Sequence, residues 1–136
     1  MATVIQEPLQ LPQDGNATGR NFGPQELDNL RQVLASGTLN CTKGTWVRKF
    51  EAALAERFGA PAVRCVTSGT AAIHTAIAAL DLEVGDEVIT TPITDMGAIT
   101  PIPYQGAIPI FADVDPLTYN VTADTIAARI TPRTRA

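Results

Sequence analysis

Short apolar runs alternate with helical patterns along the second half of the chain, and this alternation constrains the fold more than any other feature. Residues 62–66, 87–91 and 107–112 are apolar and rich in β-branched side chains, which predicts three strands. Residues 71–80 and 95–104 have the composition of helical connections. Strands that alternate with helices form a parallel sheet with the helices on its faces. The sequence therefore predicts a three-layer α/β domain with a mostly parallel sheet.

The first 60 residues lack this alternation of strands and helices. The first 20 carry no helical or strand periodicity and predict an extended arm. A first helical pattern begins at Pro24 and stops at Gly37, and a second runs from Trp46, an expected packing residue, to Gly59. The predicted divisions are an extended N-terminal arm (1–23), N-terminal helices (24–60) and the first part of an incomplete α/β domain (61–136).

The end of the chain predicts one more helix. Thr122 is a candidate N-cap for a helix that includes Ile126 and Ile130, and Pro101 must kink or shorten the preceding helical connection. The alternation of strands and helices predicts another strand after Thr131, but the sequence shows no such strand, and we expect it to be absent.

The balance of charge excludes a nucleic-acid surface. The chain has 10 Lys and Arg against 14 Asp and Glu, a net charge of −4, and no basic run longer than Arg48-Lys49. No apolar run approaches the roughly 20 residues of a membrane span. Glu7 and Asp14 interrupt the region where a signal peptide needs an apolar run. We expect a cytoplasmic protein with a small-molecule partner and neither a nucleic-acid nor a membrane partner.

The spacing of candidate ligands predicts no metal site. Cys41 and Cys65 have no second pair near them, as a zinc site or a disulfide framework would require, and Cys65 is expected to be buried. Asp113 and Asp115 resemble a metal pair, but no histidine or further carboxylate completes a site. We expect these two carboxylates to be structural.

The turn at residues 65–72 is the most informative stretch. A predicted buried strand passes through Ser68, Gly69 and Thr70 directly into a helix. Free backbone amides and the positive end of the helix dipole at such a turn bind an anion such as phosphate, and the hydroxyl groups add donors. The alternative is that Ser68 only caps the helix. Neither a P-loop lysine nor a G-x-G-x-x-G pattern accompanies the turn, so those two kinds of nucleotide site are not indicated.

Five motifs occur in a familiar order and spacing: Ser68-Gly69-Thr70-Ala71-Ala72, Gly85-Asp86-Glu87-Val88-Ile89, Gly106-Ala107-Ile108-Pro109-Ile110-Phe111, Asp113-Val114-Asp115 and Ile130-Thr131-Pro132-Arg133-Thr134. With them the chain resembles the N-terminal third of the DegT/StrS family of pyridoxal-phosphate-dependent sugar aminotransferases, from about Gly19 onward. The resemblance implies a truncated large domain of the fold-type-I aminotransferase class. It also implies a homodimer that transfers an amino group from an amino-acid donor to a nucleotide-linked keto-sugar.

The resemblance also implies roles for individual residues. Ser68, Gly69 and Thr70 match the turn that binds the phosphate of pyridoxal 5'-phosphate. Asp95 stands where the family usually has an aromatic ring that stacks on the cofactor; it either accepts a hydrogen bond from the cofactor or a substrate amine, or caps a helix. Lys43 lies in a loop like one that the family places near the active site, where it contacts a substrate phosphate or remains solvated. His74 is expected to pack, including at a dimer interface.

The chemistry of the family needs a lysine that holds the cofactor covalently, and the family supplies it far beyond the phosphate turn. Lys43 and Lys49 are the only lysines here, and both precede the turn. No catalytic residue is therefore assigned. Two interpretations remain open: an N-terminal fragment of an aminotransferase, or a non-catalytic binding or regulatory protein on the same scaffold.

Overall fold

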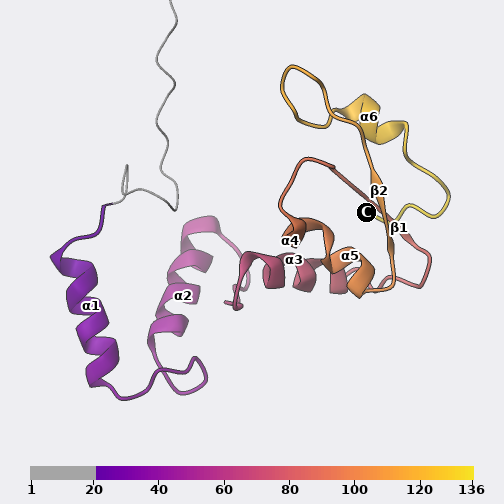
Figure 1. The fold of residues 1–136 in the computed structure, drawn as a ribbon. Coiled ribbons are helices and arrows are strands. Elements are labelled where there is room, and N and C mark those ends of the chain that lie inside the picture. Colours follow the sequence, from indigo (N-terminus) through magenta and orange to yellow (C-terminus); the bar gives the residue numbers. More distant parts are fainter. Residues whose placement is uncertain (1–20) are drawn as a thin grey trace, which may run out of the picture. The chain divides into compact units, whose positions relative to one another are not determined.

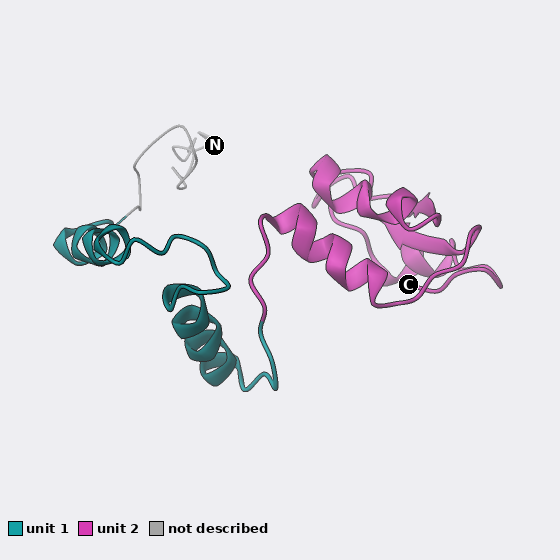
Figure 2. Ribbon diagram, turned by 90° about the horizontal axis from the view of Figure 1, so that it is seen from below, with its two compact units in different colours: residues 1–63 teal, residues 64–136 magenta. Residues whose placement is uncertain are grey.

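The computed structural model describes residues 21–136, and most of the predicted N-terminal arm lies outside them. The chain divides into two compact units, Met1–Val63 and Arg64–Ala136 (Figures 1 and 2). The first contains helices α1 (Pro24–Ala35) and α2 (Trp46–Phe58). The elements of the second, in chain order, are α3 (Gly69–Ala78), β1 (Glu87–Thr90), α4 (Met96–Ile99), α5 (Pro101–Tyr104), β2 (Ile108–Phe111) and α6 (Ala123–Ala127).

The two helices of the first unit begin and end where the sequence predicts. Pro24 occupies the first turn of α1, and a carboxylate oxygen of Glu26 accepts a hydrogen bond from the amide of Gly23 at 2.7 Å. This bond and one to its own amide hold the pKa of Glu26 below its usual range. α2 ends at Gly59, whose left-handed backbone (φ 61°) suits a residue without a Cβ.

The apolar face of α1 is open. Leu30 and Leu34 are 60% and 67% exposed. Leu27 and Leu30 of this face, with Phe22 and Trp46, line a groove of about 670 Å³. Trp46 is half-buried, and Nζ of Lys49 lies 4.9 Å from its ring centroid. The packing role of Trp46 stays a prediction.

The second unit is built on two parallel strands. β1 pairs with β2 in the register Glu87 to Ile108, and α4 and α5 form the connection between them. α3 packs against α4 and α5 (Figure 1). The small core contains Val88, Ile102 and Ala107, with Ile77 and Leu82 packed against it.

The predicted connection over residues 95–104 is confirmed in shortened form. Instead of one helix, two helices of four residues each meet at Thr100, with Pro101 in the first position of α5. Proline has no amide hydrogen to continue a helix, so a new helix begins there.

The described sheet has two strands, and residues 131–136 form no third one, as expected. The amide of Glu87 donates to the carbonyl of Arg133, the amide of Arg135 donates to the carbonyl of Glu87, both at 2.9 Å, and that of Ile89 donates to Ala136 at 2.8 Å. The bridge between Glu87 and Thr134 is parallel. Residues 133–136 thus lie beside β1, joined to it by these backbone hydrogen bonds and one isolated bridge.

The structure differs from the sequence predictions at three other places. Residues 62–66 are neither helix nor strand, and Cys65, predicted to be buried, is exposed. A β-branched apolar run fits a half-buried pleated surface but does not by itself create one, and this run lies at the boundary between the two units. α3 begins at Gly69, two residues before the predicted start. α6 starts after Thr122 as predicted but ends before Ile130.

Candidate functional site

The turn before α3 ends in a capped helix start. Ser68 has an extended backbone, and its Oγ accepts a hydrogen bond from the amide of Ala71 at 3.1 Å. The amide of Ala72 donates to the carbonyl oxygen of Ser68 at 3.0 Å. The first amides of an α-helix have no partner within the helix, so those of Gly69 and Thr70, both exposed, are accessible to water or to a ligand. Ser68 therefore caps the helix without consuming the amides that an anion needs.

The space beside Gly69 is open. A Cβ built on Gly69 would meet no other atom of the described chain within 4 Å, and the residue is not in a left-handed conformation. Neither packing nor backbone geometry requires glycine at this position. A ligand that approaches the backbone of α3 closely does require it. The geometry thus fits a phosphate group held by the start of α3.

Asp95 caps the short helix α4 next to this turn. Its Oδ1 accepts a hydrogen bond from the amide of Gly97 at 2.7 Å. A Cβ built on Gly97 would overlap with Oγ1 of Thr70 and lie 2.8 Å from Oδ1 of Asp95. The fold therefore brings Thr70 and Asp95 to one place, although they lie far apart in the sequence. The capping interpretation of Asp95 is confirmed, and its role toward a cofactor stays a prediction.

His74 packs between α3 and α5, as predicted. Its Nε2 lies 2.7 Å from Nε2 of Gln105, and its ring meets the ring of Tyr104 edge-on with centroids 5.8 Å apart. The side chain thus ties α3 to the end of the connection between the strands. A role for His74 at a dimer interface stays a prediction.

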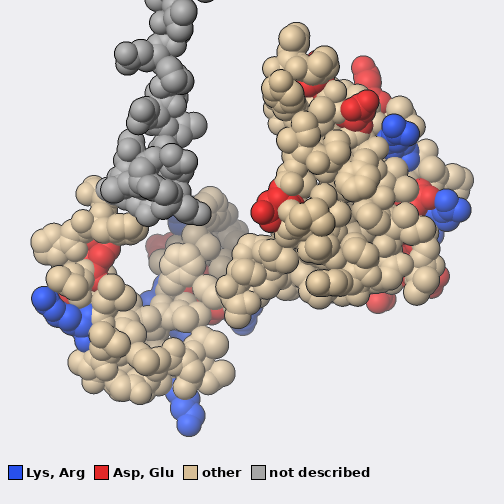
Figure 3. Space-filling view, viewed as in Figure 1, with Lys and Arg blue, Asp and Glu red and all other residues tan. Residues whose placement is uncertain are grey.

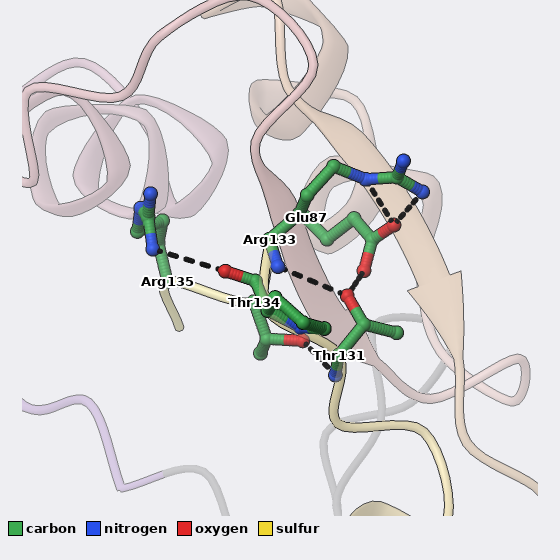
Figure 4. Close-up of polar contacts among 6 residues, drawn as sticks. Glu87, Thr131, Arg133, Thr134 and Arg135 are labelled. Atoms are coloured by element: carbon green, nitrogen blue, oxygen red, sulfur yellow. Dashed lines mark hydrogen bonds and ion pairs between the residues drawn. The ribbon is translucent and has the colours of Figure 1, made fainter.

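A buried carboxylate that the sequence analysis missed lies at the start of β1. Glu87 is 2% exposed, and Arg133 donates to its Oε1 from Nε at 2.9 Å and from Nη2 at 2.5 Å (Figure 4). The hydroxyl group of Thr131 donates to Oε2. These bonds, that of Thr131 first, hold the pKa of Glu87 below its usual range. The signal was an acidic residue at the head of an apolar strand, which needs a buried partner.

Neighbouring charges complete this cluster. Nε of Arg135 lies 3.3 Å from Oδ1 of Asp86, and Oγ1 of Thr134 accepts a hydrogen bond from the amide of Thr131 at 2.9 Å (Figure 4). Residues 131–135 are therefore bound to the start of β1 by side chains as well as by backbone. The cluster binds residues 131–135 to the start of β1 and has a structural role.

Asp113 and Asp115 bind backbone amides of their own loop. Oδ1 of Asp113 accepts from Val114, and Oδ1 of Asp115 accepts from Leu117 and Thr118, all at 2.9 Å. The bonds from Thr118 and Leu117 hold the pKa of Asp115 below its usual range. Within residues 21–136 no group of three or more His, Cys, Asp or Glu side chains is arranged to hold a metal ion. The two carboxylates are loop-forming, as predicted.

The distribution of charge and the hydropathy of the helices were both considered in the sequence analysis, and the structure describes them directly. On the face drawn in Figure 3, Lys and Arg side chains are scattered among Asp and Glu rather than gathered into one basic area. No helix in the described part of the chain has the length and hydropathy to cross a membrane.

Lys43 lies exposed in the loop between α1 and α2, and its backbone amide donates a hydrogen bond to Oδ1 of Asn40 at 3.0 Å.

Two parallel strands joined by a helical connection, as in β1, α4, α5 and β2, are typical of α/β proteins, many of which bind phosphate-containing ligands. Residues 21–136 match the DegT/DnrJ/EryC1/StrS aminotransferase family, and the chain belongs to this family. One curated relative is dTDP-4-dehydro-2,3,6-trideoxy-D-glucose 4-aminotransferase from Saccharopolyspora spinosa, 40% identical over 117 residues. That match covers 85% of this chain and 30% of the relative.

Solved structures of aminotransferases are also similar to this chain. The aminotransferase from Psychrobacter cryohalolentis superposes with a TM-score of 0.77 at 38% identity, over 85% of this chain and 29% of that one. NtdA from Bacillus subtilis, solved with the bound cofactor PMP, gives a TM-score of 0.70 at 33% identity, over 79% of this chain and 24% of that one. The chain thus spans less than a third of the length of these relatives. The predicted family and α/β fold class are confirmed.

Proposed function

We propose that this chain forms the cofactor-phosphate site of a pyridoxal-phosphate-dependent aminotransferase. The reaction transfers an amino group from an amino-acid donor to a nucleotide-linked keto-sugar. Family membership supports the reaction class, and the dTDP-sugar aminotransferase among the relatives supports the substrate class. The structure solved with PMP supports the cofactor.

The observation that carries the proposal is the open space beside Gly69. The amides of Gly69 and Thr70, the hydroxyl group of Thr70 and the dipole of α3 hold the phosphate there. Ser68 fixes the start of the helix through its bond to the amide of Ala71. Asp95, bound to Gly97 beside the turn, lies where a cofactor ring or a substrate amine approaches. When bound, the cofactor supplies the electron sink for amino transfer.

The residues of this chain bind and orient but do not supply the covalent lysine. Lys43 and Lys49 belong to the first unit and precede the turn, so neither takes that role. We propose instead that Lys43 contacts a phosphate group of the substrate. The proposal also includes a homodimer and a cytoplasmic location, as expected from the family resemblance and the sequence.

Three variants of the protein encoded by the complete reading frame test the phosphate site. Thr70→Val deletes one donor and keeps the shape, and hydrogen bonds to charged groups are worth roughly 1.5–3 kcal/mol, so cofactor affinity should fall about 10- to 100-fold. Gly69→Val fills the open space and should cost more. His74→Ala, whose side chain packs on α5, is the matched control and should leave affinity nearly unchanged.

The measurement is titration of pyridoxal phosphate, and separately of pyridoxal, into each apo variant by fluorescence. The losses should appear for pyridoxal phosphate and not for pyridoxal, because only the former carries the phosphate. Equal losses for His74→Ala and Thr70→Val would place the anion site elsewhere. Mass spectrometry of a nucleotide keto-sugar incubated with glutamate or glutamine then tests amino transfer.

A second candidate function is a non-catalytic binding protein on the same scaffold. It would use the same helix start, capped by Ser68, and the open space beside Gly69. This candidate predicts phosphate-dependent cofactor binding without covalent attachment and without amino transfer. Detection of an aminated nucleotide sugar would reject it.

A further inference from the structure

We propose that Gly97 is a positioning residue that holds the hydroxyl group of Thr70 in its phosphate-binding position, an inference that rests on the proposed function. Gly97 is the second residue of α4, and Thr70 is the second residue of α3. The two helices contact each other in the second unit (Figure 1). Gly97 itself binds no phosphate; it acts through Thr70.

The contact leaves no room for a side chain at position 97. A Cβ there would overlap with Oγ1 of Thr70 and lie 3.3 Å from its Cβ, tighter than ordinary van der Waals contact. Threonine in a helix divides between two χ1 rotamers, so the hydroxyl group can leave this place only by rotating away. The absence of a Cβ at Gly97 therefore permits the rotamer of Thr70 that the structure shows, and a Cβ there would exclude it.

The same glycine also accommodates Asp95. The built Cβ lies 2.8 Å from Oδ1 of Asp95, the atom that accepts the hydrogen bond from the amide of Gly97. A larger residue would displace the carboxylate from its cap as well as the hydroxyl group from the turn. Gly97 thus sets the position of two predicted cofactor-binding side chains at once.

Gly69 and Gly97 differ in what replaces the missing side chain. Beside Gly69 there is open space, and beside Gly97 there are protein atoms. The first glycine makes room for a ligand, whereas the second makes room for the side chain that contacts the ligand.

The test uses Gly97→Ala, Thr70→Ala and the double variant in the protein encoded by the complete reading frame. Gly97→Ala should weaken binding of pyridoxal phosphate about tenfold or more, the loss of one charged hydrogen bond, and leave pyridoxal affinity within about twofold. Thr70→Ala removes Oγ1, the atom that overlaps most with the new Cβ. The close approach to Oδ1 of Asp95 remains in that background. The loss of pyridoxal phosphate affinity in the double variant should therefore be smaller than the sum of the two single losses, and Gly97→Ala should lower the melting temperature more when Thr70 is intact.

Gly23→Ala is the matched control, because a Cβ there meets only Oε2 of Glu26, at an ordinary 3.7 Å. It should change neither affinity. If Gly97→Ala keeps full affinity for pyridoxal phosphate while Thr70→Ala loses it, the positioning role is wrong and the proposed phosphate site stands. Additive effects in the double variant also overturn the positioning role. If Thr70→Ala itself loses no affinity, the proposed site fails, and the role of Gly97 fails with it.

Discussion

At the scale of single residues, Glu87 shows how a buried charge is tolerated. Its carboxylate is almost fully enclosed and accepts bonds from Thr131 and Arg133, which replace the water it loses. Its folded-state pKa lies below the value in an unfolded chain. The group therefore contributes stability above the ordinary glutamate pKa of about 4.3, and this contribution is lost as the pH falls through the folded-state pKa.

We expect Glu87→Gln to lower the free energy of unfolding at pH 7, because the amide leaves Arg133 without its anion. The difference between wild type and variant should shrink from about pH 5 downward, as the wild-type carboxylate becomes protonated. Denaturant unfolding at several pH values measures this. Exposed Glu83, on the loop before β1, provides the control Glu83→Gln, which should follow wild type at every pH. A difference for Glu87→Gln that does not change with pH would contradict the role of its charge.

At the scale of secondary-structure elements, α6 depends on its first hydrogen bonds. Oγ1 of Thr122 accepts from the amide of Thr125 at 3.2 Å, and Oγ1 of Thr125 accepts from the amide of Thr122 at 3.0 Å. A helix of five residues has few other bonds to stabilise it. We expect Thr122→Ala to cost about 1 kcal/mol and Thr122→Ser to cost less, since serine keeps the cap. Thermal unfolding of the two variants checks this, and equal losses would show that the hydroxyl group is not the cause.

The elements that local residues determine are the ones that the sequence predicted. Pro24, Gly59 and Thr122 mark helix ends by their own chemistry, and the turn at Ser68 has its predicted place at the start of α3. Strands depend on distant partners, and this is why residues 62–66, predicted as a strand, form none. The backbone bonds between residues 133–136 and β1 were not predicted for the same reason. Gly97 escaped notice for the same reason: only the folded chain brings it against Thr70.

At the scale of the whole chain, each unit buries little. The buried core of the second unit has three residues with two more packed on it, and in the first unit no residue of α1 or α2 is fully buried. Large apolar side chains stay open, among them Phe58 at 75% exposure. Domains of this size normally bury about two thirds of their unfolded surface. The 136 residues therefore present apolar surface that water disfavours.

The lysines give a prediction for the chain as a whole. Mixed with pyridoxal phosphate and borohydride, the 136-residue polypeptide should show no stoichiometric adduct, because Lys43 and Lys49 precede the phosphate turn and belong to the other unit. Mass spectrometry of tryptic peptides measures the labelling. A single adduct on Lys43, formed at one equivalent of cofactor and lost in Gly69→Val, would contradict this and give that lysine a catalytic position.

The exposed apolar surface gives the last prediction, that the 136-residue chain self-associates at micromolar concentration. Contiguous apolar faces such as the groove lined by Leu27 and Leu30, and an open edge of a short parallel sheet, favour contacts between copies. Sedimentation velocity should show species larger than a monomer that grow with concentration, and unfolding should be broad. Leu27→Gln with Leu30→Gln should shift the distribution toward monomer, whereas Gln25→Glu on the same helix adds charge outside the groove lining and should change it less. A compact monomer with a sharp, cooperative melt would show that the units bury enough surface by themselves.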